Sequence, residues 1–516
     1  MADHHPSLRR SAANLIGGAW RPIAGDAIVS TNPAEPDSVL WTGAANLAHV
    51  VEAVEAARTA QPQWAAWGLE RRAAVLRRYQ DLCRQRAESI AELICDETGK
   101  AMWDARQEAG ALAAKIDITL ESTPNNAMAR VTGFDLDLGP TRKGRCWFRP
   151  HGVMAVLAPF NFPAHLPNGH IAPALAMGNT VVLKPSDKTP AVGQLLAELL
   201  QEVLDAEEAP AGVVNLVQGG ADVARALVSA PDIDGILFTG SWPVGRSILE
   251  ANLDHPGRIV ALEMGGNNAV IVMPDADLRQ AAIEIARSAY VTTGQRCTCT
   301  RRLIVHRAIA EKLVSAIQKI ASTLIIGHPR AEHPVFAGPI ISASARDAVL
   351  AFQSSAVRGG ARALLESTAM DRSGGGWYIT PGLLQVDRFT SAEQGDAGCD
   401  VEVFGPLLRF ALASDLDDAL AQANATRFGL AASIFTRDGG AAERFLAEAR
   451  AGCLNINVGT AGASSKLPFG GLGLSGNHRP AGSFSLDYCA YPVAGMAESG
   501  DATPIPEGMT VADGWI

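Results

Sequence analysis

Four short apolar runs constrain the fold of this chain most strongly, because each stops at a glycine, a proline or a polar residue. They lie at 152–157, 180–183, 213–217 and 235–238, and stretches with helical spacing, such as 195–204 and 223–229, separate them. Short buried strands that alternate with helices build a parallel sheet that is covered on both faces. The polar strand ends then meet at one edge of the sheet, where such sheets bind ligands.

A second set of strands is predicted at 259–263, 268–272, 302–306 and 430–436, with helices at 278–289 and 309–323 between them. We expect a second α/β unit from this repeated pattern. Before both units, the stretch 46–112 has apolar positions at helical spacing and is predicted to be helical. A hairpin at 130–149 interrupts the first unit, and a stretch at 480–497 with strand character could pair with it or with another subunit.

Length and composition exclude several classes of protein. A chain of 516 residues is too long for one ordinary core, so two or three domains are expected. The formal charge of −10 argues against a nucleic acid or a membrane surface as partner. The chain has no visible signal or membrane-spanning stretch, and its eight cysteines are sparse, so we expect a cytoplasmic protein with free thiols.

Cys297 and Cys299 stand one residue apart in the stretch Gly-Gln-Arg-Cys-Thr-Cys at 294–299. A disulfide across a single residue fits a reducing compartment poorly. No second Cys or His pair lies nearby at zinc spacing, so no metal is expected. Each thiol is therefore either a packed core residue, which is the common case, or a nucleophile whose thiolate is stabilised by nearby positive charge.

Three further motifs each have a chemical and a structural interpretation. Glu263 ends an apolar run, where a carboxyl of raised pKa would serve as general base, or would pair with an arginine. Asn161 stands between aromatic residues and prolines, where its amide would hold an oxyanion or satisfy its own turn. Residues 238–245, Phe-Thr-Gly-Ser-Trp-Pro-Val-Gly, predict a strand, a turn and a helix start that suits a phosphate, although such turns are common.

Together these motifs resemble the NAD(P)-dependent aldehyde dehydrogenases, in which Gly-Gln-x-Cys is paired with an upstream Leu-Glu-x-Gly-Gly. Further signatures follow in the order of that family: Glu-Thr-Gly-Lys at 97–100, Lys-Pro-Ser at 184–186, Glu-Val-Phe-Gly-Pro at 402–406 and Pro-Phe-Gly-Gly at 468–471. The resemblance implies an α/β fold with three parts and a tail. They are a Rossmann-type NAD-binding domain at 1–129 and 150–262, an α/β catalytic domain at 263–479, a small β oligomerisation element at 130–149 and 480–497, and a C-terminal tail at 498–516.

The resemblance also implies a role for each motif. Cys297 would attack an aldehyde as thiolate, Asn161 would hold the oxyanion, and Glu263 would activate the water that releases a free acid. The implied cofactor-binding residues are Lys184, Asp187, Gly240, Ser241, Gly245, Glu402 and Phe404. Asp187 stands where many NAD-preferring members have Glu, and its carboxylate should still repel a 2′-phosphate, so NAD is preferred to NADP. A homodimer or homotetramer is implied as well.

Within the family, the segments at 161–170, 263–268, 294–299 and 475–480 resemble the subgroup that oxidises N-succinylglutamate 5-semialdehyde in bacterial arginine catabolism. That substrate carries two carboxylates, which arginine binds best. The candidate residues for its binding are Arg296, His165, His170, His478 and Arg479.

Several alternatives stay open. Arg296 would lower the pKa of Cys297 instead of binding substrate, and His165 or His170 would be packed helix residues. The substrate would be another polar semialdehyde, such as an acetylated or a simple glutamate semialdehyde. Two more distant hypotheses are a scaffold protein of the same fold without catalytic activity, and a thiol oxidoreductase that uses both Cys297 and Cys299.

Overall fold

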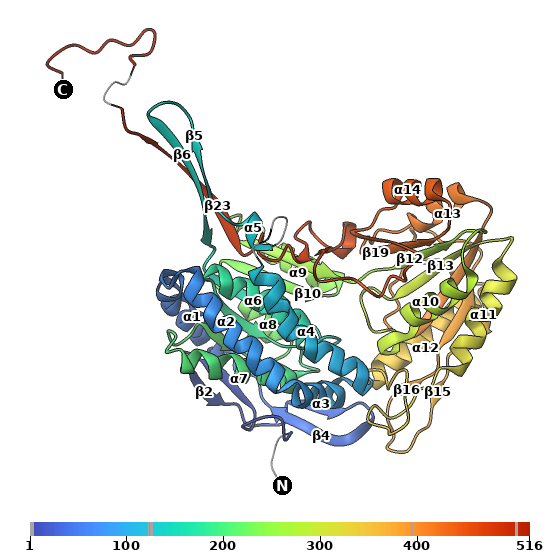
Figure 1. Ribbon diagram of the computed structural model, residues 1–516. Helices are drawn as coiled ribbons and strands as arrows, with labels where there is room; N and C mark the ends of the chain where they lie inside the picture. Colours follow the sequence, from blue (N-terminus) through green and yellow to red (C-terminus); the bar gives the residue numbers. More distant parts are fainter. Residues whose placement is uncertain (1–4, 122, 124–126, 394–395, 501–503, 516) are drawn as a thin grey trace.

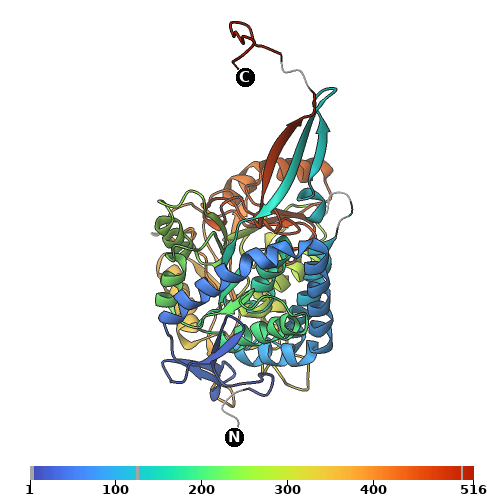
Figure 2. The same cartoon turned by 90° about the vertical axis from the view of Figure 1, so that its left-hand side faces the viewer.

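Two seven-stranded sheets dominate the computed structural model, which describes residues 5–121, 123, 127–393, 396–500 and 504–515. Helices flank each sheet, and a three-stranded antiparallel arm projects from the part of the molecule that contains the first sheet (Figures 1 and 2). The described C-terminal residues lie beyond the tip of this arm (Figure 1).

The first sheet has the strand order β11-β10-β7-β8-β9-β1-β2. Its parallel strands are β7 (Val153–Leu157), β8 (Thr180–Lys184), β9 (Val214–Leu216), β10 (Gly235–Gly240) and β11 (Ile259–Met264). The antiparallel strands β1 (Ala13–Ile16) and β2 (Ala19–Pro22) extend the edge beside β9. Because β8 follows β7 on one side and β10 lies on the other, the strand order reverses between β7 and β10. The crevice at their carboxyl ends is the usual ligand site of such sheets.

Alternate side chains of β7 pack into two different cores, which is why this strand is apolar throughout. Met154 and Val156 belong to one hydrophobic cluster, and Val153, Ala155 and Leu157 belong to another. The first cluster includes residues of α2 (Gly68–Gln85), α3 (Ala87–Thr98), α4 (Met102–Leu120), α6 (His165–Met177) and α7 (Pro190–Ala206). The second includes residues of α1 (Ala48–Ala66), α8 (Ala221–Val228) and α9 (Trp242–Ala251). The predicted sheet with two covered faces is confirmed, as are the helices predicted at 46–112.

The second sheet has the strand order β14-β17-β18-β13-β12-β19-β20. Its strands are β12 (Asn268–Val272), β13 (Thr300–His306), β14 (Arg362–Leu365), β17 (Gly382–Gln385), β18 (Leu407–Ala413), β19 (Ala431–Phe435) and β20 (Cys453–Ile456). All neighbours pair in parallel except β14, which is antiparallel to β17. Its helices are α10 (Leu278–Tyr290), α11 (Ala310–Thr323), α12 (Ala343–Arg358), α13 (Leu416–Ala423) and α14 (Gly439–Glu448).

One predicted strand lies in the other sheet. The sequence predicts 259–263 as part of the second unit, but β11 pairs in parallel with β10 and places Glu263 opposite Thr239. That assignment is wrong because an apolar run contains no information about its partner strand. β11 also continues past the domain boundary predicted at 262, and the chain leaves the first sheet only after Met264. The strands predicted at 268–272, 302–306 and 430–436 do lie in the second sheet.

The arm consists of β5 (Phe134–Asp137), β6 (Arg142–Pro150) and β23 (Ala490–Glu498), with β6 in the middle. β23 pairs with β6 along its whole length, so the predicted hairpin and the predicted late strand are confirmed as partners. Several apolar side chains of the arm are exposed, among them Phe134 at 62% and Met496 at 76%. Among the described residues, we find no helix long and apolar enough to cross a bilayer.

The remaining elements are short. They are α5 (Ala127–Arg130), β3 (Ile28–Asn32), β4 (Glu35–Gly43), β15 (Ala369–Met370), β16 (Tyr378–Ile379), β21 (Pro468–Phe469), β22 (Ala481–Gly482) and the 3-10 turns η1 (Val291–Gly294) and η2 (Gly473–Ser475).

Candidate active site

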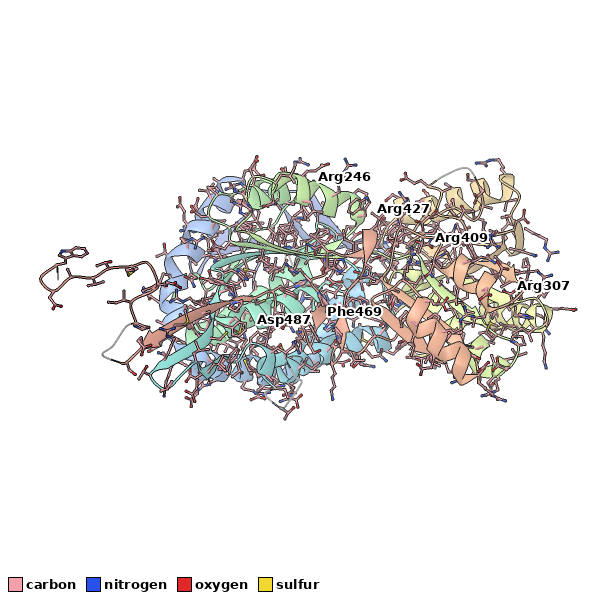
Figure 3. The ribbon with its side chains drawn as sticks, turned by 90° about the horizontal axis from the view of Figure 1, so that it is seen from above. Arg246, Arg307, Arg409, Arg427, Phe469 and Asp487 are labelled. Atoms are coloured by element: carbon pink, nitrogen blue, oxygen red, sulfur yellow. The ribbon has the colours of Figure 1, made fainter. Side chains whose placement is uncertain are left out.

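Two of the three predicted catalytic residues line one cavity between the two sheets. The cavity measures about 210 Å³ and includes Glu263 from β11 and Cys297 from the loop before β13. We call it the cysteine cavity. Figure 3 shows Phe469, another residue of its wall, near the middle of the molecule, where the two parts meet. Its wall also contains Lys115, Phe162, His165, His170, Thr239, Arg296 and the segment 461–465.

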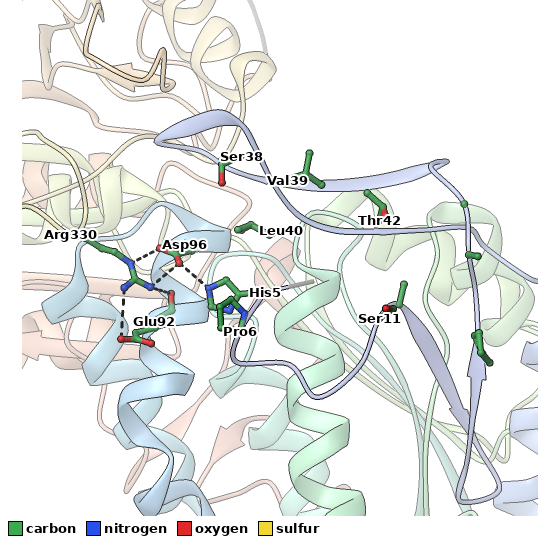
Figure 4. A pocket seen from close by; sticks show the side chains of 14 residues that line it. His5, Pro6, Ser11, Ser38, Val39, Leu40, Thr42, Glu92, Asp96 and Arg330 are labelled. Carbon is green, nitrogen blue, oxygen red and sulfur yellow. Dashed lines mark hydrogen bonds and ion pairs between the residues drawn. The ribbon is translucent and has the colours of Figure 1, made fainter. Parts of the chain in front are cut away.

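A larger cavity, of about 830 Å³, lies near the N-terminus (Figure 4). Its charged side chains are paired with one another. Asp96 accepts hydrogen bonds from Arg330 at 2.6 and 2.7 Å, and its Oδ2 lies 3.0 Å from the His5 ring. None of the residues that line this cavity belongs to the cysteine, glutamate or asparagine motifs. Size alone therefore does not identify the reactive site.

The loop that contains Cys297 has an unusual backbone. Thr292 and Thr293, in η1, both have φ of 53°. This left-handed region is costly for β-branched residues and persists only where the surroundings impose it. The Thr292 hydroxyl donates to Asp104 at 2.5 Å, and the Thr293 hydroxyl donates to a backbone carbonyl at 2.8 Å. These contacts hold the approach to the cysteine in one shape.

Cys297 and Cys299 have different surroundings, although both are free thiols. The Asn268 amide donates to both of their carbonyls, at 2.7 and 2.9 Å, and so holds the backbone between them. Cys297 is partly exposed in the cavity wall. Cys299 is fully buried and packs with Val291 and Ala461. The interpretation of Cys299 as a packed residue is consistent with this position.

The electrostatic surroundings of Cys297 differ from those expected from the sequence. Burial raises the pKa of its thiol, and the Glu402 and Glu263 carboxylates raise it further. The Arg296 guanidinium donates to Asp104 at 2.7 Å and to a threonine hydroxyl at 2.8 Å, so its charge is paired with a carboxylate of α4. A role of Arg296 in lowering the pKa of Cys297 stays a prediction.

Glu263 is almost completely buried at the end of β11, with 5% of its surface exposed. One carboxylate oxygen accepts a hydrogen bond from the Ala481 N–H at 3.3 Å, and the other has no partner among the described residues. Burial raises the pKa of this carboxyl well above its usual range. The pairing with an arginine that the sequence left open is not formed within the described chain. A buried carboxyl of raised pKa beside a thiol is suited to proton transfer.

Asn161 follows β7 and is fixed at both its side chain and its backbone. Its amide donates to the carbonyl of Gln295 at 2.9 Å, which leaves a second amide N–H. Its own carbonyl accepts a hydrogen bond from Lys100 at 2.8 Å, and Lys100 forms a fully buried ion pair with Glu108 at 2.5 Å. Glu108 also accepts two backbone N–H groups at the start of α6, at 2.9 and 3.1 Å.

The predicted substrate-binding residues fall into two groups. Arg296, His165 and His170 line the cysteine cavity. Both nitrogens of His170 are engaged, however, because Nδ1 lies 2.9 Å from the Tyr488 hydroxyl and Nε2 lies 3.2 Å from the Thr239 hydroxyl. His170 is therefore a packed residue of α6, and its prediction as a substrate ligand is wrong. His165 keeps a buried Nδ1 that has no partner among the described residues.

His478 and Arg479 do not reach the cysteine cavity. Both are exposed, and Arg479 donates to the carbonyl of its neighbour His478 at 3.2 Å. Their place in the segment 475–480, which resembles the succinylglutamate semialdehyde subgroup, suggested a role for them. Gly476, which precedes them in the chain, forms a β-bridge with Glu263. Beyond this bridge, the side chains of His478 and Arg479 lie outside the cavity wall. Their prediction as substrate ligands is corrected accordingly.

The candidate pyrophosphate turn connects β10 to α9 at the point where the strand order reverses. A Cβ at Gly240 would lie 2.3 Å from the ring of Phe238, and one at Gly245 would lie 2.3 Å from the sulfur of Met264, so a larger residue at either position would displace that side chain. Ser241 precedes α9, whose first two residues are tryptophan and proline. Proline is tolerated there because the first-turn N–H groups have no partner within the helix.

The other cofactor candidates lie at neighbouring strand ends. Lys184 ends β8 and is buried, which lowers its pKa, while the Asp187 carboxylate acts to raise it. Glu402 accepts a hydrogen bond from a glycine N–H at 3.1 Å, and a Cβ at Gly265 would lie 1.8 Å from its carboxylate. Phe404 packs edge-on against an aromatic ring that precedes Asn161, at 5.9 Å. A glycine-lined turn before a helix, with a lysine and carboxylates around it, fits a dinucleotide.

Three charged residues on α4 were not predicted from the sequence. Asp104, Glu108 and Lys115 are spaced by four and seven positions, which places them on one face of the helix, and their exposed fractions are 1, 2 and 3%. Charged residues at that spacing in a helix with many alanines were the signal that could have revealed them. Among the described residues there is no group of three His, Cys, Asp or Glu side chains that could hold a metal ion.

Comparison with known proteins agrees with this geometry. Residues 20–492 match the aldehyde dehydrogenase family. The chain is 44% identical over 491 residues to N-succinylglutamate 5-semialdehyde dehydrogenase 2 of Caulobacter vibrioides, covering 95% of this chain and 97% of that protein. The structure of lactaldehyde dehydrogenase from Escherichia coli is similar with a TM-score of 0.86 and 30% identity, over 95% of this chain and 99% of that chain. PnpE in complex with nicotinamide adenine dinucleotide is similar with a TM-score of 0.88 and 30% identity, over 96% and 99% of the two chains. The chain belongs to the aldehyde dehydrogenase family.

Proposed function

We propose that this chain oxidises N-succinylglutamate 5-semialdehyde to N-succinylglutamate with NAD and releases the free acid. The observation that carries the proposal is the cysteine cavity, in which the Cys297 thiol and the buried Glu263 carboxyl share a wall with cationic side chains. The name of the Caulobacter vibrioides relative supports the substrate. The nicotinamide adenine dinucleotide complex of PnpE, together with Asp187, supports NAD rather than NADP.

In the first stage, the chain turns the aldehyde into a thioester. Cys297 gives its proton to the Glu263 carboxylate, which releases it to solvent before the second stage, and the sulfur forms a bond to the aldehyde carbon, whose oxygen becomes an oxyanion. The free N–H of the Asn161 amide and the backbone N–H of Cys297 hold this oxyanion. The hydrogen bonds of the described residues do not use the Cys297 N–H, which supports this role. A nicotinamide held by Glu402 and Phe404 would supply the acceptor for the hydride of the same carbon.

In the second stage, Glu263 accepts a proton from a water molecule, whose oxygen attacks the thioester carbon. The bond between carbon and sulfur breaks, the carboxylic acid leaves, and the Cys297 sulfur takes back the proton that Glu263 accepted, which restores the thiol. The raised pKa of Glu263 supports its role as base, because a stronger base removes the proton of water more easily. For the cofactor, we assign the pyrophosphate to Gly240, Ser241 and Gly245. The adenosine ribose is assigned to Lys184 and Asp187, and the nicotinamide part to Glu402 and Phe404.

Formation of NADH from N-succinylglutamate semialdehyde tests the reaction. The wild type should form NADH, and Cys297→Ala should lose more than about 10³-fold in kcat. Cys299→Ser is the matched control and should keep its rate. Equal rates for the wild type and Cys297→Ala would refute the nucleophile.

A substrate panel tests the aldehyde. The wild type should have a higher kcat/KM for the succinylated semialdehyde than for N-acetylglutamate semialdehyde or glutamate semialdehyde. The same panel, run with NADP in place of NAD, should give lower values throughout. If succinylation brings no gain, the substrate is another polar semialdehyde.

We also propose a homodimer or homotetramer in the cytoplasm. The projecting arm supports assembly, because its exposed apolar residues Phe134, Leu136 and Met496 would be covered by a second subunit. Light scattering after size-exclusion chromatography should give a mass above that of one chain, and Leu136→Asp should reduce it. The eight free cysteines support a reducing compartment.

A further inference from the structure

Of the three buried charged residues on one face of α4, two are in ion pairs and the third is not. Asp104 is paired with Arg296 at 2.7 Å, and Glu108 is paired with Lys100 at 2.5 Å. Lys115, the third member, has 3% of its surface exposed and forms no ion pair within the described chain. A buried charge without a counter-ion is costly, so it persists only where another group compensates it.

The contacts of Lys115 are two neutral acceptors. Its ammonium donates to the carbonyl of Gly482 at 2.7 Å and to the hydroxyl of Ser485 at 3.0 Å, which leaves its third N–H. Lys115 and Gly482 both belong to the wall of the cysteine cavity. The cation therefore lies at the surface on which the substrate must rest.

The groups around Lys115 leave its charge uncompensated. His165 and His170 from α6 face it, and burial together with this ammonium lowers their pKa to about 4 and about 3, so both are neutral at pH 7. Cys489 faces it from the end of the chain, and burial raises the pKa of that thiol. Burial lowers the pKa of Lys115 itself to about 8, so the amine is mostly protonated at neutral pH. The buried Nδ1 of His165, which has no partner among the described residues, lies in the same wall.

We propose that Lys115 is the specificity-determining residue for this enzyme, and that it binds a carboxylate of the substrate remote from the aldehyde, with His165 as a second hydrogen-bond donor. The substrate class is an aldehyde that carries such a carboxylate, and the inference rests on the proposed function and deepens it. The substrate carboxylate supplies the counter-ion that Lys115 lacks. Asp104 and Glu108 on the same helix have such counter-ions within the protein. An ionic hydrogen bond of this kind is stronger than a neutral one and would raise the affinity for charged aldehydes.

The test removes the positive charge of Lys115 and keeps a side-chain donor for its two hydrogen bonds. Lys115→Gln retains donors for Gly482 and Ser485, Lys115→Arg retains the charge, and Lys312→Gln on the exposed face of α11 is the matched control. For each protein, kcat/KM is measured for N-succinylglutamate semialdehyde and for propanal, and binding of N-succinylglutamate is measured by calorimetry. In Lys115→Gln the ratio of the two kcat/KM values should fall about 10- to 100-fold, mainly through KM, and N-succinylglutamate should bind more weakly by a similar factor.

The remaining outcomes separate the two proposals. Lys115→Arg should recover most of the ratio, and Lys312→Gln should leave it unchanged. If Lys115→Gln lowers kcat/KM for both aldehydes equally, Lys115 is a structural tie between α4 and the 482–485 segment, and the inference is refuted. A wild type with no preference for the dicarboxylate refutes the proposed function, whereas a preference that survives in Lys115→Gln refutes only the role of Lys115. If Lys115→Gln does not fold, the same comparison is made with Lys115→Met.

Discussion

The buried ion pair between Lys100 and Glu108 should control both stability and catalysis. Its atoms lie 2.5 Å apart, and the two side chains are 1 and 0% exposed. Removal of one partner from a buried pair costs about 3–5 kcal/mol, because the other charge stays in the protein without compensation. We expect a loss near the lower end of this range for Lys100→Met, since Glu108 keeps two backbone N–H donors at 2.9 and 3.1 Å.

The double variant Lys100→Met/Glu108→Gln distinguishes the ion pair from simple packing. It leaves no unpaired charge, so its free energy of unfolding should exceed the value expected from the two single variants by about 2 kcal/mol. Urea unfolding of all four proteins measures this coupling. The pair Arg106 and Glu88 is the matched control, because its atoms are 2.6 Å apart but both side chains are more than half exposed, and it should show no measurable coupling.

Activity provides the second readout for the ion pair. Lys100 also holds the carbonyl of Asn161 at 2.8 Å, so its loss should move the oxyanion donor. Loss of an oxyanion donor costs about 10²–10³ in kcat, and a displaced donor should cost about 10- to 100-fold, with KM little changed. Additive free energies of unfolding in the two single variants and the double variant would show that the two charges are not coupled. An unchanged kcat in Lys100→Met would show that Lys100 does not position Asn161.

Three further predictions concern the cofactor side, the second cysteine and pH. Gly265→Ala should displace the Glu402 carboxylate, because the new Cβ would lie 1.8 Å from it, and should raise the KM for NAD at least about tenfold, measured by NADH formation. Cys299→Val should keep kcat and lower the melting temperature by no more than a few degrees, since Cys299 is a packed residue; a loss comparable to that of Cys297→Ala would favour a thiol oxidoreductase. Burial lowers the pKa of Lys115 to about 8, so its charge is present below this pH and lost above it. The kcat/KM for the dicarboxylate should therefore fall from pH 7 to 9 in the wild type, and an identical fall in Lys115→Gln would contradict this assignment.

The secondary structure was predicted from the sequence because its signals are local. The apolar runs at 152–157 and 180–183 are strands with two covered faces, and that environment requires apolar side chains at every position. The candidate residues Cys297, Glu263 and Asn161 were also identified from the sequence, because thiols, strand-end carboxyls and amides in such motifs are uncommon. Their roles stay predictions, although the structure places Cys297 and Glu263 in the wall of one cavity.

The partner of each charged side chain was decided only by the tertiary structure. Arg296 stands beside Cys297 in the sequence, yet its guanidinium is paired with Asp104 on α4. His170 lies in a segment that resembles the subgroup and lines the cysteine cavity, but both of its ring nitrogens are engaged by side chains of the protein. The spacing of Lys115 on α4 could have marked it as one of three charged residues on a helix face, but a lysine becomes a candidate ligand only when burial leaves it without a counter-ion. Sequence by itself determined which segments form strands and helices and which residues have reactive side chains. Contacts between distant segments decided where the charges are compensated, since such pairing depends on distance in space.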